Sequence, residues 1–207
     1  MSEHTKPTRK DGLATKQSLI DAAERLFAEQ GIDNVKLVDV SRAAGQKNRT
    51  AAQYHFVDRS GLIHAVLDKH SVHIARQRKK LLEELDQSAP IGKLVEVLVM
   101  PVVQHIRNDP NGLTYLYLNR QLVSSSNHLE LGRERSSRMP EVLELQRRMR
   151  AAIPDQNEAV IHTKMILVHC MLFNGLANFY DLSPAGAISV FVDTLCASIE
   201  AVLMQAT

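Results

Sequence analysis

The sequence predicts an all-α protein in which a small N-terminal helical domain is joined to a larger helical C-terminal domain. Apolar residues recur at helical spacing along most of the 207-residue chain, and no segment sustains the alternating pattern of a β-strand. The apolar and charged fractions, 44% and 23%, suit a globular protein built from Ala, Leu, Val and Ile. We therefore expect about nine helices in two domains.

The first element is a predicted helix that begins near Thr15. Gly31 is placed to end it in a left-handed conformation. Its apolar face consists of Leu19, Ala22, Ala23, Leu26 and Phe27. Residues 1–12 precede it and carry Lys6, Arg9 and Lys10, so we expect a mobile basic arm, with an ordinary frayed terminus as the alternative.

Two short helices around a tight turn are predicted next. The second helix spans about 37–44 and ends at Gly45, and the third runs from about Asn48 or Arg49 to His55. Asp58 can cap a fourth helix, which an apolar stripe extends to about Leu85. The predicted domains are thus residues 1–12 as the arm, 13–60 as the helix-turn-helix domain and 61–207 as the C-terminal domain.

Five further helices are predicted, over about 91–107, 112–124, 138–151, 156–181 and 184–205. Asp155 precedes Glu158 by three residues as in a capping box, and Ser183 stands before Pro184 at a first helical position. The polar segment 124–138 is predicted to be a mobile loop.

Charge is distributed unevenly along the chain. Residues 1–80 contain 15 Lys and Arg against 9 Asp and Glu, whereas the remainder contains 10 against 14, so the parts carry +6 and −4. A basic N-terminal part joined to an acidic remainder is typical of a nucleic-acid-binding domain attached to another domain.

The sequence predicts a cytoplasmic protein without a membrane span. The N-terminus is polar, and no apolar run reaches the roughly 18 residues that a spanning helix needs. Cys170 and Cys196 have neither the density of a disulfide scaffold nor the spacing of a zinc site. We expect both to be buried as small apolar side chains.

The predicted third helix carries side chains suited to DNA. Residues 47–55, KNRTAAQYH, combine positive charge, hydrogen-bonding groups and two alanines that permit close packing on a supporting helix. The alternative for these nine residues is an ordinary solvated surface helix.

The order of features from Thr15 to Leu67 resembles the N-terminal domain of the TetR family of bacterial transcription regulators. The resemblance rests on TKQSLIDAAERLFAEQG, VDVSRAAG, the end of the recognition segment at Tyr54-His55-Phe56, and the Asp58-Arg59-Ser60-Gly61-Leu62 opening of the fourth helix. It covers about a quarter of the chain. One extra residue between Gly45 and Tyr54 places the sequence with the subgroup that has a longer turn.

The resemblance implies roles for side chains of this segment. Thr50, Tyr54 and Arg59 would contact phosphates, and Arg49 and Gln53, with Asn48 or Lys47, would contact base edges. Phe56 is expected in the core, whereas His55 could face either way. The full set of DNA-binding candidates is Arg9, Lys10, Arg42, Lys47, Asn48, Arg49, Thr50, Gln53, Tyr54, His55 and Arg59.

The resemblance also implies a C-terminal domain that dimerises and encloses a ligand. Two very apolar helices agree with a homodimer, although a fully internal core is the alternative. The predicted interface residues are Met165, Leu172, Leu176, Ile188, Phe191, Leu195 and Ile199. The predicted pocket residues, each of which could also be an ordinary core or surface residue, are His105, Tyr115, Tyr117, Asn119, Arg120, His169, Phe173 and Asn174.

Together these features predict a ligand-responsive transcriptional regulator that binds a pseudo-palindromic operator in double-stranded DNA. We expect a repressor released by a small, largely apolar organic effector, with no catalytic activity, cofactor or metal. His70 and His73 have a spacing that could hold a metal, but a polar helix face is the expected explanation. The alternative function is a helical metal- or small-molecule-binding protein without DNA binding.

Overall fold

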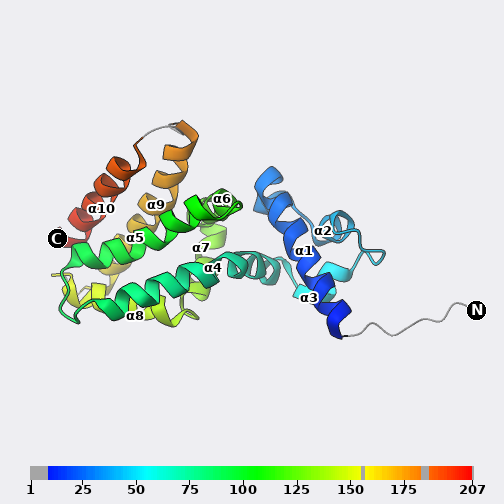
Figure 1. Cartoon of the computed structure of the whole chain (residues 1–207), viewed down its shortest axis with the longest axis horizontal. Coiled ribbons are helices and arrows are strands. Elements are labelled where there is room, and N and C mark those ends of the chain that lie inside the picture. The colour runs from blue at the N-terminus through cyan, green and yellow to red at the C-terminus, as the bar shows by residue number, and fades with distance from the viewer. Residues whose placement is uncertain (1–8, 155–156, 183–186, 207) are drawn as a thin grey trace, which may run out of the picture. The chain divides into compact units, whose positions relative to one another are not determined.

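The computed structural model describes residues 9–154, 157–182 and 187–206. Within these residues it contains ten α-helices, one short 3₁₀ helix and no strand, which confirms the all-α fold class (Figure 1). The chain divides into an N-terminal domain that ends at Lys69 and a C-terminal domain that begins at His70. This division falls inside one helix, α4 (Arg59–Glu84), rather than at its start.

The N-terminal domain contains α1 (Arg9–Gln30), η1 (Ile32–Asn34), α2 (Leu37–Ala43), α3 (Ala51–Phe56) and the first part of α4. The prediction of a mobile arm over residues 1–12 is wrong for 9–12, because α1 begins at Arg9; residues 1–8 lie outside the described part. Gly31 has a φ of 81°, and its N–H donates to the carbonyl of Phe27 at 3.0 Å. The predicted end of the first helix is therefore confirmed.

A small apolar core holds this domain together. Leu19, Ala23, Phe27, Val40, Ala52, Leu62, Val66 and Leu67 are all fully buried. Lys69 joins α4 to α1 by hydrogen bonds to Asp21 at 2.8 Å and to Glu24 at 2.6 Å. Burial lowers the pKa of Lys69, but the bonds to these two carboxylates outweigh it and raise that pKa overall.

The start of α4 follows from two residues of the predicted cap. The Asp58 carboxylate accepts the N–H of Gly61 at 2.8 Å, which confirms Asp58 as the cap. A side chain at position 61 would collide with the backbone oxygen of Phe56, so the close approach of α3 and α4 requires glycine there.

The C-terminal domain adds α5 (Ile91–Asn108), α6 (Gly112–Val123), α7 (Ser126–Ser136), α8 (Pro140–Ala152), α9 (Glu158–Leu182) and α10 (Ile188–Met204) (Figure 1). α9 packs against α6 and α10, while α5 packs against α6, α8 and α10. The prediction of a loop over 124–138 is wrong, because α7 occupies most of it. Its sequence is rich in ion pairs within the helix, such as Arg133 with Glu130, and has too few apolar residues to show a helical period.

The predicted start signals of the last two helices have different outcomes. Asp155 and residues 183–186 lie outside the described residues. The observed cap of α9 is Asn157, whose side-chain oxygen accepts the N–H of Ala159 at 2.9 Å. α10 is described from Ile188 onward, later than the predicted start at 184.

α9 is, among the described residues, the one helix long and apolar enough to cross a membrane. Here it packs against α6 and α10, with Val168, Leu172 and Leu176 buried. Lys164, in the same helix, is also buried and donates to the carbonyls of Leu203 and Gln205. One face of α9 therefore packs into the C-terminal domain.

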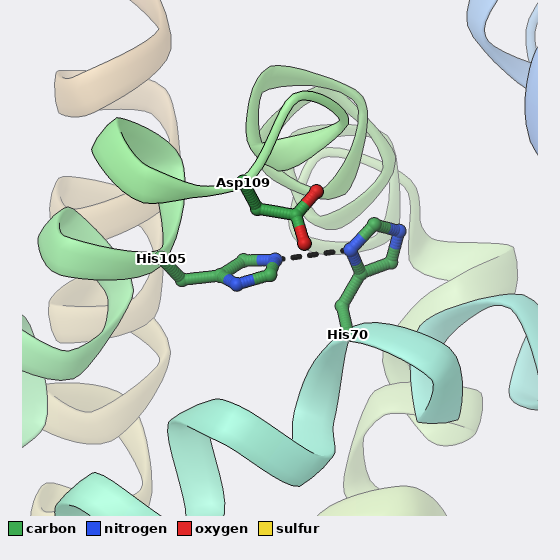
Figure 2. A group of neighbouring side chains, drawn as sticks. All are labelled: His70, His105 and Asp109. Carbon is green, nitrogen blue, oxygen red and sulfur yellow. Dashed lines mark hydrogen bonds between the residues drawn. The ribbon is translucent and has the colours of Figure 1, made fainter.

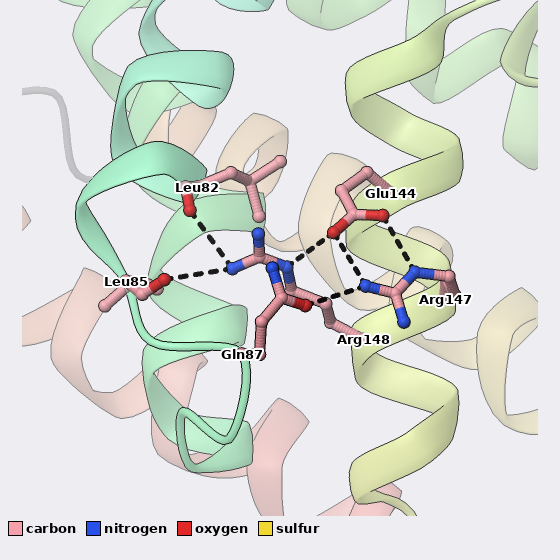
Figure 3. Close-up of polar contacts among 6 residues, drawn as sticks. All are labelled: Leu82, Leu85, Gln87, Glu144, Arg147 and Arg148. Atoms are coloured by element: carbon pink, nitrogen blue, oxygen red, sulfur yellow. Dashed lines mark hydrogen bonds and ion pairs between the residues drawn. The ribbon is translucent and has the colours of Figure 1, made fainter.

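A buried arginine joins α8 to the end of α4 (Figure 3). Arg148 donates through Nη1 to the carbonyls of Leu82 at 3.0 Å and Leu85 at 3.2 Å, and through Nε to Glu144 at 2.7 Å. Hydrogen bonds from Arg147 and from Arg148 lower the pKa of Glu144 to about 2. Arg148 thus satisfies carbonyls that the last turn of α4 leaves without helical partners.

We expect Arg148→Met to lower the free energy of unfolding by about 2 to 3 kcal/mol, because buried carbonyls lose a charged donor. Arg147→Met is the matched control. Its side chain is 60% exposed, so the loss should stay below about 1 kcal/mol. Urea unfolding followed by circular dichroism measures both, and equal losses would contradict the assignment of Arg148.

Candidate nucleic-acid interface and ligand cavity

The DNA-binding candidates of the N-terminal domain lie in the turn before α3 and on α3 itself. The predicted start of this helix at Asn48 or Arg49 is wrong, because α3 begins at Ala51. The side-chain oxygen of Asn48 accepts both the N–H of Thr50 at 3.0 Å and its hydroxyl at 2.8 Å. This local turn competes with helix and delays its start.

The turn and α3 present a two-sided surface. Ala51, Ala52 and Phe56 are buried, which confirms the prediction for Phe56, and the N–H of Ala52 donates to the Ser41 hydroxyl of α2 at 3.0 Å. The exposed side contains Lys47, Asn48, Arg49, Thr50, Gln53 and Tyr54, which we call the α3 face. Tyr54 is 83% exposed. Its hydroxyl, with the cations and amides beside it, supplies the donors that contact phosphates and base edges in DNA-binding proteins.

The remaining DNA-binding candidates lie around this face. Arg42, in the last turn of α2, is 71% exposed and lies 3.4 Å from Asp39. Arg59 is 41% exposed, and its Nη1 lies 3.7 Å from Asp33. His55 is half-buried between Tyr54 and Phe56. Arg9 and Lys10 form the first turn of α1, and their side chains are outside the described part.

A cavity of about 980 Å³ lies within the C-terminal domain. Its apolar lining includes Ile74, Leu98, Val102, Leu122, Leu172 and Phe173. Of the predicted pocket residues, Tyr115, Asn119, His169 and Phe173 line it. A cavity of this size with apolar walls and a few polar groups suits a small organic ligand.

Four predicted pocket residues do not line this cavity: His105, Tyr117, Arg120 and Asn174. Tyr117 donates to Asp181 at 2.6 Å and Arg120 does so at 2.9 Å, so both join α6 to the end of α9. Burial and the hydrogen bond to Asp181 raise the pKa of Tyr117 to about 12. Asn174 accepts a hydrogen bond from Ser124 at 3.0 Å. Helical periodicity could not tell which face of α6 each side chain occupies.

Two residues of the cavity wall, Arg78 and His169, carry buried polar groups. Arg78, on α4, is 5% exposed and donates to the carbonyl of Leu98 at 3.3 Å. Arg78 stands in the basic run RQRKK, which is typical of a solvated helix face, so the sequence alone does not indicate that this side chain is buried. Burial lowers the pKa of His169, whose Nδ1 lies 2.6 Å from the carbonyl oxygen of Met165.

His105 instead belongs to a cluster with His70, which is also buried, and the half-buried Asp109 (Figure 2). His70 Nδ1 and His105 Nε2 share a hydrogen bond at 3.0 Å, and the potential ligand atoms of all three residues lie within 4.8 Å of one another. Two imidazoles and a carboxylate are donors that Zn²⁺ accepts. The sequence spacing pairs His70 with His73. His73 is exposed, however, and the partner of His70 in the structure is His105.

The predicted interface residues are mostly internal. Leu172, Leu176, Leu195 and Ile199 are buried within the chain, so their assignment to a dimer surface is wrong. Met165 lines the cavity, whereas Ile188 and Phe191 are half-buried. The exposed apolar side chains of α9 and α10 include Ile166, Leu167 and Val190. A shallow groove of about 450 Å³ between these helices is lined by Leu167, Met171 and Phe191, among others.

The N-terminal domain is a helix-turn-helix domain by its order of helices, and comparison with known proteins assigns its family. Residues 19–66 match the family model described as bacterial regulatory proteins, tetR family. The N-terminal domain therefore belongs to the TetR family, which confirms the resemblance seen in the sequence.

Relatives and solved structures agree with this assignment. The chain is 31% identical over 93 residues to the HTH-type transcriptional regulator TtgR of Pseudomonas putida, a match that spans 44% of this chain and 43% of TtgR. The chain thus matches less than half of the length of this relative.

Two solved structures share the fold over nearly the whole chain. NalD of Pseudomonas aeruginosa gives a TM-score of 0.60 at 19% identity, covering 95% of this chain and 100% of that one. SmeT of Stenotrophomonas maltophilia, in a complex with triclosan, gives a TM-score of 0.58 at 17% identity, covering 89% and 91%. The C-terminal domain thus has the fold seen in these two structures.

Proposed function

We propose that this protein is a ligand-responsive transcriptional repressor that binds a pseudo-palindromic DNA operator as a homodimer. The α3 face is the main support for this proposal. It is a cluster of exposed cations, amides and Tyr54 on a TetR-family domain, and the opposite side of α3 is buried against the rest of that domain. NalD and SmeT are named as repressors of multidrug efflux pumps, which supports a repressor here. A helical binding protein without DNA binding is less favoured, because it would give the α3 face no role.

The contacts of the α3 face follow from the hydrogen-bonding capacity left on each side chain. Asn48 uses its side-chain oxygen for Thr50, which leaves its NH₂ to donate to a base or phosphate. Arg49 and Gln53 are our candidates for guanine and adenine edges. Tyr54, Thr50 and Arg59 would contact phosphates. The exposed Arg59–Asp33 pair contributes little and is readily exchanged for a phosphate.

Release from DNA would be a shift between two states of the protein. α4 carries Arg59 at its first residue and the cavity residues Ile74 and Arg78 further along. An effector that binds better to the state with low DNA affinity must weaken operator binding by the same coupling free energy. The proposed effector site and the proposed phosphate contact of Arg59 would then share one continuous helix, α4.

The homodimer would use the exposed apolar side chains of α9 and α10. These helices leave Leu167 and Val190 exposed beside the shallow groove, and a second copy could bury them around a two-fold axis. We infer that the protein acts in the cytoplasm, where its DNA target lies, and that it does so without catalysis or a cofactor.

Selection of fragments from the source genome by the purified protein tests the proposed function. A small set of enriched fragments that share an inverted repeat is the expected result. Footprinting on one such fragment is then repeated with compounds that the genes next to the fragment suggest as effectors. Loss of the footprint measures release of the protein from DNA. Enrichment no better than for random fragments, at moderate salt, would reject operator binding.

The double substitution Arg49→Ala with Gln53→Ala should relax sequence preference. Each lost base contact is expected to cost about 1 to 3 kcal/mol on the operator and little on random DNA. Fluorescence anisotropy with operator and scrambled duplexes measures the ratio of affinities. An unchanged ratio would show that these two side chains do not contact the bases.

Arg59→Ala should instead weaken binding to all duplexes and reduce the slope of log affinity against log salt by about 1, because one phosphate contact is lost. Arg25→Ala is the control, since Arg25 is an exposed arginine on α1 outside the candidate set. The same salt slope for both variants would show that Arg59 does not contact a phosphate.

Leu167→Glu combined with Val190→Glu should convert the dimer to monomers, because two charges per copy would be buried at the interface. Val72→Glu, at an exposed apolar residue of α4, is the control for added charge. Light scattering after size exclusion measures the mass of each. A stable dimer of the double variant would place the interface elsewhere.

A further inference from the structure

Arg78 is the deepest charged group of the cavity, and its hydrogen bonding is incomplete. Its side chain is 5% exposed, and its Nη2 donates to the carbonyl of Leu98 at 3.3 Å. Its Nε is buried without a hydrogen-bond partner, and none of the described carboxylates forms an ion pair with this guanidinium. Such a group costs free energy in the empty protein unless something pairs with it.

Three ionisable groups near Arg78 influence its pKa. Burial is the largest influence on the pKa of Arg78 and lowers it; Tyr115 and Glu141 oppose that shift, while Arg135 adds to it. Glu141 is not among the cavity-lining residues, whereas Arg78 and Arg135 are. A ligand in the cavity thus meets the cations rather than the carboxylate.

Three other arginines of the cavity wall have carboxylate partners. They lie toward solvent, and each has a carboxylate within ion-pair distance: Arg133 with Glu130, Arg147 with Glu144, and Arg150 with Glu158. Arg78 differs from these three arginines because it is buried and has none of the described carboxylates within ion-pair distance.

We propose that the effector is an organic monoanion whose acidic group pairs with Arg78 and whose apolar body fills the rest of the cavity. Ile74, Leu98, Val102 and Phe173 supply the apolar contacts, and the volume of about 980 Å³ accommodates a drug-sized molecule. A planar guanidinium in an apolar wall binds a carboxylate or sulfonate by charge-assisted hydrogen bonds. This inference rests on the proposed effector role of the cavity and names the chemistry of the ligand.

Two fluorescent probes with one aromatic skeleton test the charge preference directly. Anilinonaphthalene sulfonate is anionic, and N-phenylnaphthylamine is its neutral counterpart. The wild-type protein should bind the sulfonate at least about tenfold more tightly, and decanoate should displace it where decanamide does not. Equal affinity for both probes, or equal displacement by acid and amide, overturns the proposal.

Arg78→Met should lower the affinity for the sulfonate by about tenfold or more and change that for the neutral probe by less than about threefold. Arg78→Lys, which retains the charge, should recover part of the difference. Arg76→Met, an exposed arginine two residues earlier on α4, is the matched control and should leave both affinities unchanged. Equal loss for both probes in Arg78→Met would show a packing role only.

The wild-type comparison of the two probes and the two competitors decides the proposal even if Arg78→Met does not fold. Operator binding is measured separately on the enriched fragments without any probe. A protein that binds its operator but shows no charge preference in the cavity would reject the monoanion and leave the proposed repressor standing. A charge preference in the cavity without operator binding would support the monoanion as ligand and reject the proposed repressor.

Discussion

The packing of α3 on α2 is the constraint on which the nucleic-acid interface depends. α3 has six residues and is far too short to be stable alone. It is held by the burial of Ala51, Ala52 and Phe56 and by the bond from the Ala52 N–H to Ser41. Larger side chains at the two alanines would push α3 away from α2. Gln53 and Tyr54, on the exposed side of α3, take their direction from this contact.

Buried arginines take two different roles in the C-terminal domain. Arg148 donates to two carbonyls and a carboxylate, so its charge is compensated within the fold and it holds α8 to α4. Arg78 is equally buried, but only one carbonyl accepts from it. The difference lies in the neighbours that each guanidinium meets. A satisfied group stabilises the fold, whereas an incompletely satisfied one beside a cavity favours a ligand of opposite charge.

The same helix, α4, serves both domains. Its first turn is fixed by Asp58 and by the lack of a side chain at Gly61, and its last turn is fixed by Arg148. Between these ends it contributes Arg78 to the cavity and His70 to the cluster with His105. A change in how a ligand contacts α4 therefore acts on a helix whose two ends are both anchored.

Local spacing and capping signals predicted the order of the first four α-helices, the Asp58 cap, the buried Phe56 and the TetR family, although α1 begins earlier and α3 later than expected. Of the residues that the sequence predicted for the pocket from polar groups in apolar helices, half, among them Tyr115 and His169, line the cavity. Tertiary structure decided the rest. Arg78 lies in a basic run yet is buried. His105 is hydrogen-bonded to His70 and does not line the cavity, and Leu172 is buried inside the chain. These outcomes depend on which helix packs against each face, and that information is absent from the spacing of residues within one helix.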